Sequence, residues 1–380
     1  MAERLPSQWD VRRRRLVAII LYVFGIGGIG GAPRTVAGAA PAPEWNAKFE
    51  GKSGWIGGDG VYSAPLSPIR MLWIFSDSLI GRTRDNQRVE TALVNNTIAI
   101  QAGPRADAAI AFSNGLTPGG KPGAVIIPTD GKGWFWPQSA VRVGSDLAIF
   151  LPRIEKTGDG GAFGFQQTGL SLAMIENPSD DPLRWRLTQC TVPHARFENG
   201  NQVSWGSAVL VDHETIYVYG YEQRKVTGAA KGLLVARAPA SRLADFASWR
   251  FRSADGWSKS VGDACPLAEG MGAEFSVCAA PPGYGLILVY TDKGLSDRIM
   301  GRFANSPEGP WSAPKLLYQC PENHRDKGVF CYAAKAHGWA SEGNRLLISY
   351  CVNSWRLERL FQDEKVYRPK FVWVEFQAKH

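Results

Sequence analysis

The chain has 380 residues and a net charge of +8, from 43 Lys and Arg against 35 Asp and Glu. Its 42 glycines, 24 prolines and 14 tryptophans are typical of many short strands joined by tight turns, and they argue against a protein built from long helices. Half of the net positive charge lies in residues 1–39, which hold six arginines and two acids, so no nucleic-acid partner is expected.

The N-terminus has the layout of an export signal. Four arginines, Arg12–Arg15, precede the apolar run Leu16–Ile29, and the small residues Ala37-Gly38-Ala39 follow. An uncleaved anchor is the alternative, because the 17 uncharged residues of Leu16–Ala32 are just long enough to span a bilayer.

These features divide the chain into three parts. We expect a signal peptide or N-terminal anchor over residues 1–39, a linker over 40–53 and a folded domain over 54–380. The protein is then secreted, periplasmic or held at the cell surface, and it contacts a membrane only if the N-terminal segment is retained.

A predicted hairpin near the start of the domain carries two acids. Asp59 lies in the turn Gly57-Gly58-Asp59-Gly60, where glycines allow a sharp bend, and their N–H groups are expected to keep Asp59 ionised. The runs Val61–Pro65 and Met71–Phe75 flank a second turn, and Asp77 follows. Because antiparallel pairing brings the strand ends together, we expect the two acids to lie close to each other. Two carboxylates in one cleft are the minimum for hydrolysing a glycosidic bond.

Pairs of strands recur five times along the chain. The second strand of each pair is expected at 71–78, 146–153, 215–222, 286–293 and 346–353, and its partner at 58–65, 136–143, 205–212, 274–281 and 334–341. Further strands are expected at 93–101, 170–176, 232–239, 297–305 and 367–376. Five such units predict an all-β fold, a five-bladed β-propeller, with a β-sandwich or a mixed α+β chain as the alternatives.

All six cysteines lie in the second half of the chain. They are Cys190, Cys265, Cys278, Cys320, Cys331 and Cys351. An even number in an exported chain predicts disulfides, and sequence proximity favours Cys320 with Cys331 and Cys265 with Cys278. The spacing of cysteines and histidines does not support a zinc site.

The same segments carry a family resemblance. GGDGVYSAPL with LWIFSDSLIG, NNTIAIQ, WGSAVL, EFSV with LVYT, and AKAHGWAS with LLISYCVNS resemble exported five-bladed propeller proteins of a domain of unknown function. These proteins are similar in design to arabinanase, xylosidase and levansucrase-like propeller glycoside hydrolases. The resemblance covers residues 54–376 and implies a funnel with three carboxylates: an Asp on the first blade, a second Asp that tunes pKa values, and a Glu general acid.

Carried onto this chain, the resemblance implies that Asp59 is the first-blade acid and that Glu274 is the general acid. The apolar neighbours of Glu274 suit a protonated carboxyl group. Asp77 is the candidate for the second acid, although it lies on the first blade. The segment Trp136–Ala140 of the second blade has no carboxylate where such chains carry one. This departure favours a propeller that has lost catalysis as the alternative.

Other side chains are candidates for binding a sugar or an ion. Flat aromatic faces and amide or guanidinium groups suit sugar rings and hydroxyls, and the candidates are Trp55, Trp136, Trp205, Trp339, Asn96, Asn353 and Arg82. The resemblance also implies that His337 can help to hold a structural calcium ion through water. No other cofactor is required for this chemistry.

We therefore expect a monomeric glycoside hydrolase-like protein that acts on a polysaccharide or oligosaccharide. A carbohydrate-binding propeller without catalysis and a structural module of the cell envelope are the alternatives. A phosphate-binding loop is not expected, because no Lys-Ser/Thr follows the glycines around Asp59.

Overall fold

The structure is a computed structural model that describes residues 35–158, 164–198, 200–225 and 231–378. The predicted leader therefore lies outside the described residues up to position 34. Within the described ranges, no helix combines the length and apolar character that crossing a membrane requires.

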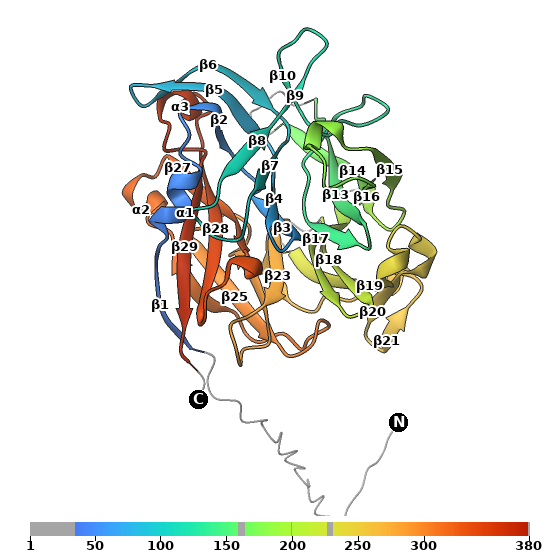
Figure 1. Ribbon diagram of the computed structural model, residues 1–380. Helices are drawn as coiled ribbons and strands as arrows, with labels where there is room; N and C mark the ends of the chain where they lie inside the picture. Colours follow the sequence, from blue (N-terminus) through green and yellow to red (C-terminus); the bar gives the residue numbers. More distant parts are fainter. Residues whose placement is uncertain (1–34, 159–163, 199, 226–230, 379–380) are drawn as a thin grey trace, which may run out of the picture. The chain divides into compact units, whose positions relative to one another are not determined.

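Antiparallel sheets make up nearly all of the regular structure, and in the described residues five of them have four or more strands (Figure 1). The first sheet contains β3 (Tyr62–Ser67), β4 (Arg70–Phe75), β7 (Thr97–Gln101) and β8 (Ile110–Ser113). The second contains β11 (Trp134–Phe135), β12 (Ala140–Val143), β13 (Asp146–Lys156), β14 (Phe165–Ile175) and β15 (Leu187–Thr191).

The remaining large sheets follow in chain order. The third contains β16 (Arg196–Glu198), β17 (Asn201–Asp212), β18 (Thr215–Gln223), β19 (Lys231–Pro239), β20 (Arg250–Ser253), β21 (Gly256–Ser258) and β22 (Glu269–Met271). The fourth contains β23 (Phe275–Ala279), β24 (Leu286–Thr291), β25 (Arg298–Ala304) and β26 (Lys315–Gln319). The fifth contains β27 (Val329–Ala336), β28 (Arg345–Ser354), β29 (Pro369–Phe376) and β1 (Val36–Pro41).

Two small sheets and several short helices complete the described elements. The small sheets are β2 (Ser53–Gly58) with β5 (Ser78–Arg84) and β6 (Gln87–Val94), and β9 (Gly115–Leu116) with β10 (Pro122–Gly123). The α-helices are α1 (Pro43–Lys48), α2 (Glu322–Arg325) and α3 (Arg359–Gln362). Single 3-10 turns occur at Pro182–Arg184, Ala240–Arg242, Phe246–Ser248, Val261–Asp263 and Gly338–Ala340.

The apolar core is divided among the boundaries between sheets. Strands that are buried on both faces present apolar side chains to a neighbour on each side. One buried cluster joins the first and second sheets, another the second and third, and others the third and fourth, the fourth and fifth, and the fifth and first. Each large sheet thus packs against two others.

One strand from each large sheet lines a common cavity of about 530 Å³. The lining residues come from β3, β12, β17, β23 and β27 and from the ends of these strands. β12 contacts both β3 and β17, and β23 contacts both β17 and β27. These five strands therefore line one shared cavity.

The strands predicted from period-two patterns are largely confirmed. β4, β13, β18, β24 and β28 match the predicted second strands, and Tyr62 pairs with Ile74 across the predicted hairpin. The fifth partner strand differs from the prediction: β27 begins at Val329, and the segment 338–340 forms a 3-10 turn.

The predicted linker over 40–53 is largely folded. β1 pairs with β29 at the edge of the fifth sheet, so strands from near both ends of the chain lie side by side (Figure 1). In α1, Trp45 is buried against Trp73 and Phe371. Burial of this indole holds the segment in place, which the polar and proline-rich sequence did not indicate. The folded unit therefore includes residues that the sequence assigned to the leader and linker.

All six cysteines are free thiols in the structure. The predicted Cys265–Cys278 disulfide is absent: the Cys265 thiol donates to the carbonyl of Asp263, whereas Cys278 packs against Gly338. Cys320 and Cys331 are not bonded, but their sulfur atoms are neighbours.

Candidate active site

Asp59 and Asp77 meet where the predicted hairpin places them. Asp59 lies between β2 and β3, and its backbone N–H donates to the carbonyl of Asp77 at 3.1 Å. The N–H of Ser76 donates to the carbonyl of Asp59 at 3.0 Å. Gly60 has a φ of +80°, and a Cβ there would lie 2.9 Å from the backbone nitrogen of Ser76, so the turn requires glycine. The sequence thus encodes the contact between the two acidic residues locally.

Two tyrosines hold the carboxylate of Asp59. The hydroxyl groups of Tyr332 and Tyr367 donate to its Oδ2 at 2.6 and 3.1 Å, while Oδ1 is buried without a partner. Burial, with the negative charges of Asp77 and Glu274, raises the pKa of Asp59 to about 8, although the two tyrosine hydrogen bonds act to lower it. The expectation that glycine N–H groups keep Asp59 ionised is therefore wrong, because its side-chain donors are tyrosines.

Asp77 is held by side chains from two connecting segments, one just before β7 and one just after β11. The indole N–H of Trp136 donates to its Oδ1 at 2.7 Å, and the amide of Asn95 donates to the same oxygen at 3.1 Å. Burial raises the pKa of Asp77 to about 6, and these two hydrogen bonds counteract the effect. Trp136, a predicted ligand contact, is therefore part of the acid cluster.

Glu274 enters the site from the fourth sheet with a cation beside it. The ammonium of Lys335, on β27, donates to Oε1 of Glu274 at 3.0 Å. It also donates to the carbonyl of Ala333 at 2.9 Å and lies 4.3 Å from the ring centroid of Tyr62. The side chain of Lys335 is 2% exposed and that of Glu274 is 27% exposed. A buried ammonium requires an anionic partner, and Glu274 supplies it here, whereas the sequence led us to expect only apolar neighbours around Glu274.

A buried arginine fixes the segment that carries Tyr367. Arg88 is 5% exposed, and its guanidinium donates to the carbonyl of Ile56 in β2. The same group donates to four carbonyls just before Tyr367, those of Leu360, Asp363, Glu364 and Val366. The loop is therefore tied to the strand that leads into Asp59, which positions the Tyr367 hydroxyl.

The second sheet places an amide near the acids. Gln138 is 6% exposed, and its amide N–H lies 3.4 Å from the carbonyl of Ala273, the residue before Glu274. Its Oε1 is buried without a partner. The second sheet therefore contributes a neutral side chain here, as the sequence of its opening indicated.

Three predicted contact residues belong to the core instead. Trp55 is 4% exposed and stacks on Phe112. Trp205 is fully buried, and its indole N–H donates to the carbonyl of His194. Asn96 is 1% exposed and bonds the backbone of Ile126 through both its amide nitrogen and its oxygen. These predictions are wrong, because each side chain is enclosed by the protein.

His337 and Trp339 face Ser63 and not the acids. The ring nitrogens of His337 pair with the hydroxyls of Ser63 at 2.6 Å and Ser349 at 2.8 Å, and burial lowers its pKa to about 3. The indole of Trp339 donates to the same Ser63. With both nitrogens engaged, His337 is a core histidine, which argues against the expected calcium role.

Two further predicted residues lie farther from the reacting groups. Arg82 is 66% exposed and forms a 3.7 Å ion pair with Glu90 on the hairpin of β5 and β6, so it does not screen the acids. The amide of Asn353 lies 3.4 Å from the hydroxyl of Tyr332 and touches the site only through that residue.

Sequence reasoning missed the residues that set the charge of the site. Tyr332, Lys335 and Tyr367 are about 270 or more residues from Asp59 in the chain, and no local pattern connects them to it. A positive φ of 56° at Ala333 marks a β-bulge between Tyr332 and Lys335. Bulges are common beside active sites because they redirect side chains, so an interrupted alternation in this strand was the available signal.

Comparison with solved structures finds chains of similar fold. A putative hydrolase from Bacteroides ovatus ATCC 8483 aligns with a TM-score of 0.70 at 19% identity, covering 88% of this chain and 90% of that one. An α-L-arabinofuranosidase from Lactobacillus brevis aligns with a TM-score of 0.49 at 12% identity, covering 84% of this chain and 91% of that one. A GH43_1 enzyme from Xanthomonas citri, complexed with xylose, aligns with a TM-score of 0.43 at 14% identity, covering 89% of this chain and 94% of that one. At these identities the alignments concern the fold alone.

Sequence comparison is informative at the level of the family. A search of curated proteins found no match. A family profile described as a domain of unknown function, DUF5005, matches residues 43–376, which include every residue of the acid cluster. The chain belongs to the DUF5005 family.

Proposed function

We propose that this protein is a glycoside hydrolase that cleaves a polysaccharide or oligosaccharide at the site formed by Asp59, Asp77 and Glu274. The observation that carries the proposal is the convergence of three carboxyl groups from two sheets, close enough that Asp77 and Glu274 raise the pKa of Asp59. Glycoside hydrolysis requires a proton donor and a carboxylate on either side of the scissile bond.

The proposal includes a fold of five blades arranged as a propeller. Each of the five large sheets shares one buried cluster with the sheet before it and another with the sheet after it, including the fifth with the first. A closed ring of sheets around the cavity accounts for this pattern. The alignment with a putative hydrolase at a TM-score of 0.70 supports the proposed hydrolase activity.

We assign the catalytic proton to Asp59 and the anionic role to Glu274. A pKa of about 8 keeps Asp59 protonated at neutral pH, so it can protonate the oxygen of the leaving sugar. Glu274, paired with the buried ammonium of Lys335, serves as the nucleophile or as the base that activates water. Asp77 supports the proton donor, because its negative charge helps to raise the pKa of Asp59. These roles are the reverse of those that the resemblance implies.

The experiment is an activity screen of the full chain on plant and bacterial cell-wall glycans. Release of reducing ends should be detected with the wild type and should fall at least 100-fold in Asp59→Asn and Glu274→Gln, because each variant removes one of the two required carboxyl groups. Asp255→Asn, which alters an exposed acid, is the matched control and should retain full activity. Equal activity in all four proteins would contradict the assignment of the site.

Gln138 favours a second candidate, a carbohydrate-binding propeller without catalysis. It places an amide beside Ala273, and an amide cannot act as a proton donor or a nucleophile. In that case glycans should bind to the wild type in calorimetry without release of reducing ends. Absence of both binding and cleavage across the panel would instead favour a structural role in the cell envelope.

We also propose that the protein is exported and that it is a monomer. The basic, apolar and small-residue order of residues 1–39 supports export. Fusing this segment to a reporter enzyme that works only outside the cytoplasm tests this proposal, with Arg12–Arg15 replaced by glutamines as the control. Sedimentation of the purified chain tests the monomer.

A further inference from the structure

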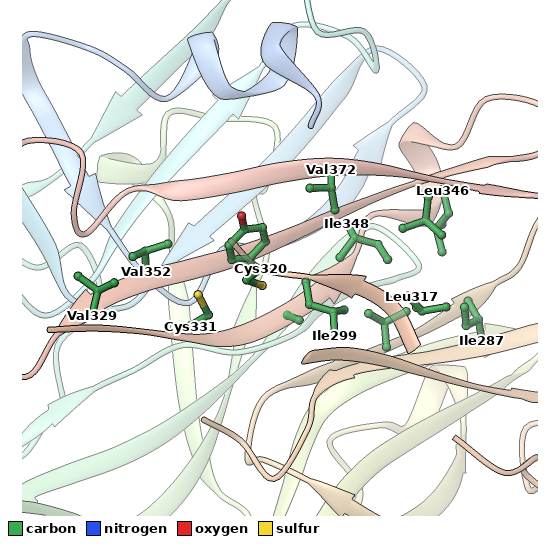
Figure 2. Close-up of a cluster of buried hydrophobic side chains, with 14 of the residues drawn as sticks. Ile287, Ile299, Leu317, Cys320, Val329, Cys331, Leu346, Ile348, Val352 and Val372 are labelled. Atoms are coloured by element: carbon green, nitrogen blue, oxygen red, sulfur yellow. The ribbon is translucent and has the colours of Figure 1, made fainter. Parts of the chain in front are cut away.

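Cys320 and Cys331 bring two thiols together in the core between the fourth and fifth sheets. Cys320 directly follows β26, and Cys331 lies in β27. Their sulfur atoms and a carboxylate oxygen of Glu322 all lie within 4.8 Å of one another. Cys320 is fully buried and Cys331 is 1% exposed. Figure 2 shows the two sulfur atoms side by side among apolar side chains that include Val329 and Val352.

Neighbouring backbone fixes both cysteines. The N–H of Cys320 donates to the carbonyl of Asp297 at 2.7 Å, and the carbonyl of Cys331 accepts from the N–H of Ser296 at 3.1 Å. Adjacent residues of one loop thus hold the two cysteine backbones. Their approach follows from the fold and does not depend on a flexible segment.

The surroundings suit a disulfide better than a metal ion. A metal binds thiolates, but burial raises the pKa of the Cys320 thiol and so opposes its ionisation. The third neighbour, Glu322, already accepts a hydrogen bond from the hydroxyl of Tyr350, which lies 3.0 Å from each of its carboxylate oxygens. A closed metal site takes four ligands, and the described residues offer these three. A disulfide is neutral and fits the apolar cluster.

We propose that Cys320 and Cys331 form a disulfide when the protein folds in an oxidising compartment. Each thiol loses one proton and one electron, and the two sulfur atoms bond to each other. The oxidant is the disulfide of a thiol–disulfide oxidoreductase, which is reduced to two thiols. This inference rests on the proposed export and is independent of the proposed hydrolase activity, so either can fail alone.

The bond would stabilise the strand that carries part of the acid site. It closes a short loop over residues 321–330, which contains α2 and Asp326, an ion-pair partner of Arg359. Cys331 directly precedes Tyr332, whose hydroxyl donates to Asp59. Fixing Cys331 therefore limits the motion of the residue that positions the candidate acid.

The test compares the full chain produced in the bacterial periplasm with the same chain produced in the cytoplasm. Free thiols are alkylated after denaturation, and proteolytic peptides are analysed by mass spectrometry without reductant. The periplasmic protein should show a peptide pair linked through Cys320 and Cys331, with the other four cysteines alkylated, and elemental analysis should find no stoichiometric metal. The periplasmic protein should also unfold a few degrees higher than its reduced form.

Two variants separate this bond from general effects of cysteine loss. Cys331→Val should remove the linked peptide and abolish the effect of reductant on the unfolding midpoint, whereas Cys190→Ser, at an exposed cysteine, should change neither. Alkylation of both Cys320 and Cys331 in the periplasmic protein would overturn the proposal, as would a link to another cysteine or one bound zinc ion per chain.

Discussion

Asp59 lies buried against two tyrosine hydroxyls, and this position makes the stability of the protein depend on pH. Below about pH 4 it is protonated in both the folded and unfolded states. The unfolded chain loses this proton near the ordinary value of 3.8, whereas the folded chain keeps it up to about pH 8. The stabilisation that Asp59 contributes is therefore complete below about pH 4, declines as the pH rises, and is gone above about pH 8.

Asp59→Asn should remove this decline. The variant keeps the shape of the side chain but cannot ionise, so its free energy of unfolding relative to the wild type should rise by roughly 3–4 kcal/mol between pH 5 and pH 8. Urea unfolding at both pH values measures the difference. Asp255→Asn, at an exposed acid, should show no such change, and equal pH dependence of wild type and Asp59→Asn would contradict the raised pKa of Asp59.

Glu274→Gln should have the opposite effect on stability. It leaves the ammonium of Lys335, which is 2% exposed, without its anionic partner. We expect a loss of about 2 kcal/mol in the free energy of unfolding at pH 7, less than for a fully buried pair because Glu274 retains some exposure. Denaturant unfolding measures this loss. The double variant Glu274→Gln with Lys335→Met should recover part of it, and additive losses in the double variant would show that the pair is not coupled.

At the scale of elements, β27 and the residues after β28 form an aromatic path from the surface to Asp59. The ring of Trp355 is 4.3 Å from that of Phe330, which is 5.5 Å from that of Tyr332. Trp355 is 52% exposed. Exposed aromatic faces bind the apolar faces of sugar rings, so we expect Trp355 to contact a glycan that binds near the acids.

Trp355→Ala should weaken glycan binding about tenfold and leave the unfolding midpoint nearly unchanged, because a half-exposed ring contributes little to the core. Calorimetry with the glycan found in the activity screen measures the first effect, and thermal unfolding measures the second. Trp257→Ala, which alters a partly exposed tryptophan of the third sheet stacked under Arg237, is the control and should bind normally. Equal affinities of wild type and Trp355→Ala would remove Trp355 from the site.

Local sequence patterns predicted most strands but not the contacts between distant strands. Strands with dense apolar and aromatic runs, such as β13 and β18, were predictable because such runs are typical of strands buried on both faces, and four or more consecutive residues of each are buried. β27 was misplaced because a bulge at Ala333 interrupts its alternation. The contact of Asp59 with Asp77 was predictable because a hairpin creates it. The partners Tyr332 and Lys335 were not, since only the packing of distant sheets brings them to the acids.

At the scale of the whole molecule, the N-terminal segment joins the last strands of the chain. β1 pairs with β29, the N–H of Ala42 donates to the carbonyl of Phe371, and the indole of Trp373 donates to Glu44. Period-two patterns could not predict the pairing of β1 with β29, because the residues of β1 are small and only weakly apolar. The five large sheets of the described residues could be predicted from repeated strands, but the residues that connect the ends of the chain could not.

Shortening the chain from its N-terminus tests whether this segment belongs to the fold. A protein that begins at residue 35 retains β1 and α1, whereas one that begins at residue 50 loses both, together with Trp45 and Phe49 of the core shared by the fifth and first sheets. Because burial of one large aromatic side chain typically contributes about 3–5 kcal/mol, the shorter protein should unfold at a much lower denaturant concentration or fail to fold. Trp45→Ala in the longer protein isolates the indole and should give a smaller loss of the same sign. Denaturant midpoints compare the three proteins, and identical midpoints for chains that begin at residues 35 and 50 would show that the segment is only a linker.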